Sequence, residues 1–159
     1  SLIMEELREK KQLIYNVGLD NYTTPYGTYI TLEISCKNKD IEDVVKGTLK
    51  ILKKLATGKF RTEYLRYVKQ AYTLEHYETC LNNSYLSGFF GEQYINQIYN
   101  FEEKPVILTF DQVAKSILKI SKPNFVLFVK KLLIFSNMKI AYQGKREVKN
   151  LPALVLNKI

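Results

Sequence analysis

Apolar and polar residues alternate with different periods along the chain, and each period predicts a different secondary structure. Apolar residues recur at helical spacing over 1–11, which predicts a helix. Residues 13–19 are rich in β-branched and aromatic side chains, and residues 28–36 alternate strictly between apolar and polar. Both patterns are typical of strands. Turn residues that include Pro25 and Gly27 separate them, so we expect an antiparallel pair.

Helical periodicity dominates the rest of the chain. It predicts helices over 40–55, 63–79, 84–99, 109–120 and 121–135. Asn38 or Asp40 can cap the first of these helices, and Gly58 suits the position just after it. Thr109-Phe-Asp-Gln112 fits a capping box. A last short strand is expected over 138–142.

This order of elements predicts an α+β fold. Helices would pack on one face of a mainly antiparallel sheet, because strands come first and a run of helices follows. Three strands make a thin sheet, so we expect further strands of the same sheet to lie outside these 159 residues. We therefore expect one incomplete domain over 1–145 and an irregular C-terminal tail over 146–159.

The chain is basic, with 24 Lys and Arg against 16 Asp and Glu and a net charge of +8. From Gln112 onward there are ten basic residues and one acidic residue, Glu147. Such a surplus attracts nucleic acid. However, all but one of these residues are lysines, and Lys115, Lys119 and Lys122 follow the helical spacing of a solvated helix face, whereas base recognition favours arginine. A basic nucleic-acid-binding domain is therefore our weakest hypothesis.

Membrane association is not expected. No stretch approaches the ~18 consecutive apolar residues of a membrane span. The first residues show neither the basic nor the apolar region of a signal peptide, which favours an intracellular location.

The single histidine, His76, limits catalytic chemistry within the chain. A catalytic zinc usually has three protein ligands, and a Ser-His-Asp or Cys-His arrangement would need His76. Its place in the middle of a predicted helix favours a solvated or packed helix residue. Cys36 and Cys80 form no C-x-x-C pattern, and we interpret both as small buried hydrophobic residues.

One segment carries a more specific signal: Leu7-Arg-Glu-Lys-Lys-Gln-Leu-Ile-Tyr-Asn-Val17. It resembles the insulinase-like (pitrilysin) zinc metallopeptidases, in the second of the two related halves that make up such enzymes. There a helix ends in Leu-Arg-x-Lys, and Leu-x-Tyr-x-Val opens a strand. Arg8 and Tyr15 lie seven apart, as in that pattern. The order of elements agrees with the family over about 1–145.

The resemblance implies roles for these two residues. In the family, this Arg and Tyr contact the substrate backbone near the scissile carbonyl, so Arg8 and Tyr15 are expected to bind substrate and stabilise the transition state. The family's zinc is held by H-x-x-E-H in the first half, where the Glu activates the attacking water. This chain has no H-x-x-E-H. We expect it to bind no zinc and to be inactive alone.

The leading hypothesis is therefore the substrate-binding C-terminal part of a zinc metallopeptidase that hydrolyses peptide bonds. Its expected partners are a peptide or protein substrate and a zinc-bearing N-terminal half or partner subunit. The alternative is a non-catalytic binding or assembly subunit of the same fold, because some family members lack the metal motif.

Overall fold

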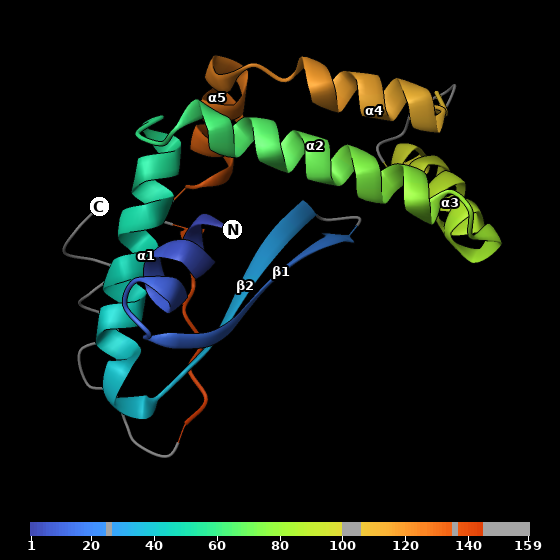
Figure 1. Ribbon diagram of the computed structural model, residues 1–159. Coiled ribbons are helices and arrows are strands. Elements are labelled where there is room, and N and C mark those ends of the chain that lie inside the picture. Colours follow the sequence, from blue (N-terminus) through green and yellow to red (C-terminus); the bar gives the residue numbers. More distant parts are fainter. Residues whose placement is uncertain (25–26, 100–105, 135–136, 145–159) are drawn as a thin grey trace. The chain divides into compact units, whose positions relative to one another are not determined.

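The computed structural model describes residues 1–24, 27–99, 106–134 and 137–144 (Figure 1). The chain forms two compact units, which we describe separately. Unit 1 contains Ser1–Asp20, Ile30–Phe60 and the described residues from Pro123 onward. Unit 2 contains Asn21–Tyr29 and Arg61–Lys122.

Up to the last helix, the elements follow the predicted order. They are the π-helix η1 (Met4–Glu9), strands β1 (Ile14–Thr24) and β2 (Gly27–Cys36), the short 3-10 helix η2 (Asn38–Asp40), and helices α1 (Ile41–Ala56), α2 (Thr62–Thr79), α3 (Asn83–Tyr99), α4 (Phe110–Lys119) and α5 (Lys122–Leu132). The two strands pair in one antiparallel sheet, which confirms the α+β fold class.

The core of unit 1 joins η1, β1 and α1. Leu7 of η1, Ile14 of β1, and Val44 and Ile51 of α1 are buried against one another. These residues come from a helix end, a strand start and one face of an amphipathic helix, so burying their apolar surface fixes the three elements together.

Helix α1 ends as the sequence predicts. Gly58 has φ 69°, a left-handed conformation that costs glycine little. The Gly58 N–H donates to the Leu55 carbonyl at 3.2 Å, and the Lys59 N–H donates to the Lys54 carbonyl at 2.9 Å. Together these bonds form a Schellman motif.

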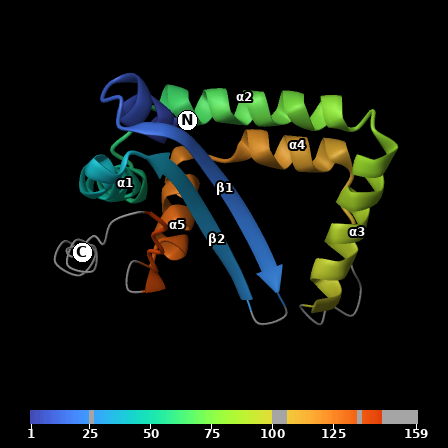
Figure 2. The same ribbon diagram turned by 90° about the horizontal axis from the view of Figure 1, so that it is seen from below.

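Helices α2 and α4 of unit 2 lie side by side (Figure 2). The predicted capping box of α4 is confirmed, because Thr109 Oγ1 accepts from the Gln112 N–H and the Gln112 side chain accepts from the Thr109 N–H. The Lys69 ammonium of α2 donates to the carbonyls of Leu118 and Ile120 at 2.6 and 2.9 Å. It thereby satisfies carbonyl groups at the end of α4.

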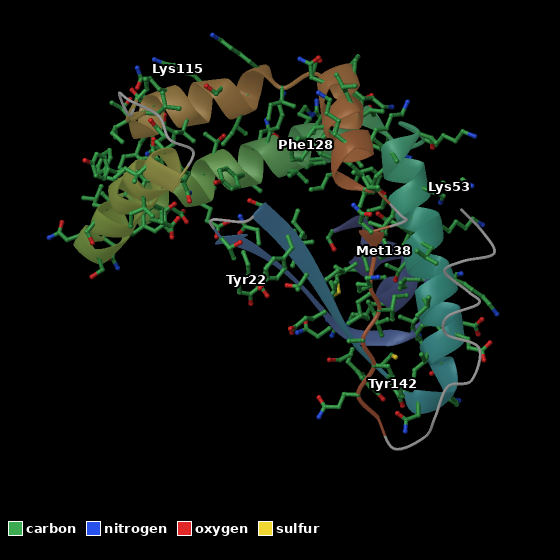
Figure 3. All side chains as sticks on the ribbon, turned by 180° about the vertical axis from the view of Figure 1, so that it is seen from behind. Tyr22, Lys53, Lys115, Phe128, Met138 and Tyr142 are labelled. Atoms are coloured by element: carbon green, nitrogen blue, oxygen red, sulfur yellow. The ribbon has the colours of Figure 1, made fainter. Side chains whose placement is uncertain are left out.

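Two predicted details are wrong. Helix α2 begins at Thr62, one residue earlier than expected, and Arg61 occupies the N-cap. No strand forms over 138–142, because a strand needs a hydrogen-bonded neighbour and the sheet within the described ranges contains β1 and β2 alone. The Tyr142 hydroxyl instead donates to Asn38 Oδ1 at 3.3 Å (Figure 3). The expected tail over 146–159 lies outside the described residues.

Candidate functional site

The candidate site is built on the end of η1 in unit 1. Leu7 is 1% exposed and packs into the core, while its neighbour Arg8 is exposed. The anchor is tight, because a Cβ added to Gly47 of α1 would lie 2.6 Å from Leu7 Cδ2. Leu7 therefore fixes the backbone from which Arg8 projects.

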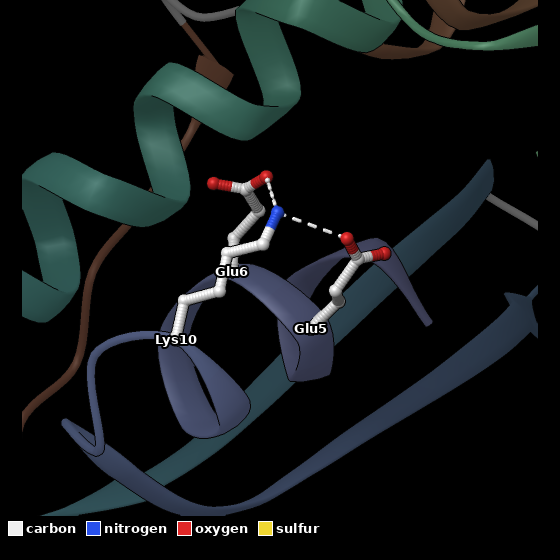
Figure 4. Close-up of polar contacts among 3 residues, drawn as sticks. All are labelled: Glu5, Glu6 and Lys10. Carbon is white, nitrogen blue, oxygen red and sulfur yellow. Dashed lines mark hydrogen bonds and ion pairs between the residues drawn. The ribbon is translucent and has the colours of Figure 1, made fainter.

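Acidic residues near Arg8 are engaged by a different cation. The Lys10 ammonium lies 2.9 Å from Glu5 Oε1 and 2.9 Å from Glu6 Oε1 (Figure 4). The hydrogen bond from Lys10 holds the pKa of the Glu6 carboxyl below its usual range, and the same contacts raise the pKa of Lys10. This pairing leaves the Arg8 guanidinium uncompensated by either carboxylate.

A tight turn connects η1 to β1. The Gln12 N–H donates to the Arg8 carbonyl at 2.9 Å, and the Leu13 N–H donates to the Leu7 carbonyl at 2.8 Å. Gln12 has φ 54°, in the left-handed region. The turn therefore joins Leu7, the residue before Arg8, to Leu13, the second residue before Tyr15. The chain enters β1 at once, with Ile14 buried and Tyr15 57% exposed.

Both predicted site residues are therefore exposed on neighbouring elements of one unit. Within the described residues, neither the Arg8 guanidinium nor the Tyr15 hydroxyl has a hydrogen-bond or ion-pair partner. Arg8 offers a planar fork of N–H donors and Tyr15 a hydroxyl donor. Such donors suit a carbonyl oxygen that gains negative charge.

The sequence analysis missed a hollow beside this turn. It has a volume of about 460 Å³ and is lined by Lys11, Leu13, Asp43, Lys46, Gly47 and Lys50. The four lining residues of α1 lie on one helix face at i, i+3, i+4 and i+7 spacing. This spacing is visible in the sequence and could have indicated that the four residues share a surface. The lining of the hollow contains three lysines and one aspartate, so its charge is mainly positive.

His76 is a packed helix residue of unit 2, one of the two alternatives expected. It is 3% exposed, and its ring packs against Phe110 and Phe89 at centroid distances of 4.9 and 5.4 Å. Its Nδ1 lies 3.4 Å from the Tyr85 hydroxyl. The Cys80 thiol donates to the carbonyl of His76 and not to its ring. This arrangement contains no nucleophile–base pair.

Cysteine burial was predicted too strongly, because Cys36 and Cys80 are free and only partly buried. Metal-binding chemistry is likewise not assembled: the described part of the chain brings together no group of three or more His, Cys, Asp or Glu that could hold an ion. The described residues therefore supply no set of zinc ligands. None of the described helices has the length and apolar character needed to cross a bilayer.

Comparison with known families agrees with the segment that carries Arg8 and Tyr15. Residues 1–72 match the peptidase M16 inactive domain, a range that includes η1, both strands, α1 and the first part of α2. No curated protein matches the chain. The match supports the resemblance to the C-terminal half of insulinase-like metallopeptidases. Over residues 1–72, a little under half of the chain, the sequence is similar to the M16 inactive-domain family.

Proposed function

We propose that this chain is the substrate-binding C-terminal part of a zinc metallopeptidase whose zinc site lies on another part of the protein. The observation that carries the proposal is the family match over residues 1–72, which contains the Arg8 and Tyr15 pattern. Two exposed donors without partners in the described chain, next to a rigid core, are suited to binding a substrate backbone.

In this proposal Arg8 and Tyr15 act on the carbonyl group of the peptide that is cleaved. Arg8 binds a backbone carbonyl through its guanidinium fork, and Tyr15 donates its hydroxyl proton in a hydrogen bond to the oxygen on which charge develops. Fixed donors of this kind stabilise an oxyanion more than a neutral carbonyl, so they lower the barrier as well as binding substrate. Zinc bound to the other half would supply the activated water.

The rigid parts of the site support this role. Leu7 and Ile14 anchor the backbone on the two sides of the turn, and the Leu13 N–H joins these sides. A donor held in place before substrate binds requires little reorganisation in the transition state.

We further propose that the family domain spans about 1–145 and is completed by strands from elsewhere in the protein. A two-stranded sheet is marginal by itself in water. Leu19 of β1 is 69% exposed and Tyr29 of β2 is 54% exposed, so the hairpin keeps apolar surface that a neighbouring segment could cover.

Complementation tests the proposed division of labour. We expect this chain alone to release no product from a quenched fluorescent peptide, with or without added zinc. Mixing it with a separately produced zinc-bearing half should restore hydrolysis. Zinc-dependent hydrolysis by the chain alone, or full activity of the other half without it, would contradict the proposal.

A second candidate function is a non-catalytic binding or assembly subunit, which the inactive type of the matched domain favours. The same mixing experiment separates the two candidates. A stable complex that binds peptide but hydrolyses none of it in the presence of zinc would favour the second function.

A further inference from the structure

Helix α3 of unit 2 holds an extended segment of the same chain by its main chain. The Gln93 side chain donates to the Leu108 carbonyl at 3.2 Å and accepts from the Leu108 N–H at 2.8 Å. The Gln97 side chain donates to the Val106 carbonyl at 2.8 Å and accepts from the Val106 N–H. Each side-chain amide therefore pairs with both polar groups of one residue, as a neighbouring β-strand would.

The spacing of this contact follows from the geometry of the two elements. Four residues of a helix rise about 6.0 Å, and two residues of an extended chain span about 6.6 Å. Glutamines at i and i+4 therefore match alternate residues of an extended peptide. Thr109 continues the extended conformation with φ −74° and ψ 163°.

An aromatic contact continues the same register. Phe89 lies four residues before Gln93, and Phe110 lies two residues after Leu108. Their rings stack at a centroid distance of 4.1 Å and an angle of 21°. The Phe110 ring also packs against Phe90 and His76. The segment is thus held by two main-chain contacts and one aromatic anchor.

The Val106 side chain contributes little to this contact, whereas the Ile107 and Leu108 side chains are more than half buried. Val106 is 67% exposed, Ile107 is 38% exposed and Leu108 is 37% exposed. Because the hydrogen bonds fall on N–H and C=O groups that every residue except proline carries, other sequences in the same conformation can form the same two pairs of hydrogen bonds.

We propose that this face of α3 is a binding site for an extended peptide with an aromatic residue two positions after its second glutamine-paired residue. Residues 106–110 occupy the site as an internal ligand that an outside peptide can replace. This site is separate from Arg8 and Tyr15, and the proposal does not depend on peptidase function.

The test uses the full chain and a fluorescent peptide, acetyl-Val-Ile-Leu-Thr-Phe-amide. Val106→Pro with Leu108→Pro removes both N–H donors of the internal segment and frees the site. The apparent affinity for an outside peptide is the intrinsic affinity multiplied by the fraction of molecules whose site is free. We therefore expect this variant to bind the peptide at least about tenfold more tightly than the unaltered chain. Equal binding to both proteins would overturn the proposal.

Two controls identify the contact. A peptide N-methylated at its Val and Leu keeps the side chains but lacks the donors, and it should not bind. Adding Gln93→Leu with Gln97→Leu to the released variant should abolish binding, whereas adding Asn96→Leu, another exposed amide of α3, should not. Binding of the N-methylated peptide, or binding of the unmodified peptide to the variant with Gln93→Leu and Gln97→Leu, would contradict the proposed contact.

Amide exchange on the unaltered chain decides the matter if the proline variant does not fold. The Val106 and Leu108 amides should exchange at least about tenfold faster than amides in the middle of α3, because the segment opens locally. Exchange of these two amides only with global unfolding would show a permanent structural contact and refute the proposal.

Discussion

The contact between Gly47 and Leu7 gives the sharpest stability prediction for the candidate site. A Cβ at residue 47 would lie 2.6 Å from Leu7 Cδ2, whereas carbon atoms pack best at about 3.5–4.0 Å. Overpacking a core costs about 1–3 kcal/mol, and replacing Gly by Ala inside a helix returns about 1 kcal/mol. We therefore expect Gly47→Ala to destabilise the chain by about 1 kcal/mol.

A double-mutant cycle with Leu7→Ala tests this clash, because Leu7→Ala removes the side-chain atoms that the added Cβ would meet. Leu7→Ala creates a cavity in the core and should cost about 3 kcal/mol. In the double variant the added Cβ enters the space that the Leu7 side chain left, so the helix gain remains and the clash disappears. We expect the double variant to lose about 2 kcal/mol of unfolding free energy, whereas independent effects would add up to a loss of about 4 kcal/mol.

Urea unfolding followed by circular dichroism measures these free energies, and amide exchange at Ile51 reports on unit 1 itself. Gly88→Ala in α3 is the matched control, because no atom lies within 4 Å of its added Cβ. It should stabilise its helix by about 1 kcal/mol. A double variant within about 0.5 kcal/mol of additivity would refute the packing argument.

Three further predictions concern unit 2. Lys69→Met should lower its stability by about 1–2 kcal/mol in urea, because two carbonyls of α4 lose their donor, while exposed Lys119→Met should change nothing. Thr109→Ala should cost about 1 kcal/mol through loss of the capping box, and an unchanged urea midpoint would disprove this. The hydrogen bond from Tyr77 to Asp111 raises the pKa of Tyr77. Its stabilisation is therefore complete below the unfolded pKa near 10 and is lost as pH rises through the folded value. Tyr77→Phe should weaken the alkaline loss of stability, measured as melting temperature from pH 8 to 12.

Local features of the fold could be predicted from the sequence because their partners are close in the chain. The capping box joins Thr109 to Gln112, and the Gly58 end joins residues at most five apart. The strand expected over 138–142 failed for the opposite reason. Its apolar pattern is local, but a strand also needs a hydrogen-bonded neighbour, which the pattern does not specify.

The same difference between local patterns and long-range contacts applies to the candidate site. Arg8 and Tyr15 were found through a family pattern, and their exposure follows from their buried neighbours Leu7 and Ile14. Side-chain contacts between distant residues left no local signal. The Gln93 and Gln97 amides bind residues 9–15 positions away, and nothing in the helix pattern of α3 indicates that partner. The π-helical form of η1 was also not predictable, because its apolar spacing fits an α-helix as well.

Peptide hydrolysis by the proposed enzyme, in which this chain is combined with a zinc-bearing half, tests the central claim most directly. We expect Arg8→Ala and Tyr15→Phe each to lower kcat/KM by about 100-fold, as loss of an oxyanion donor does, without changing the unfolding midpoint. Arg61→Ala and Tyr67→Phe are matched exposed controls and should keep full activity. If Arg8→Ala and Tyr15→Phe kept the same kcat/KM as these controls, the assignment of substrate binding to this site would be wrong.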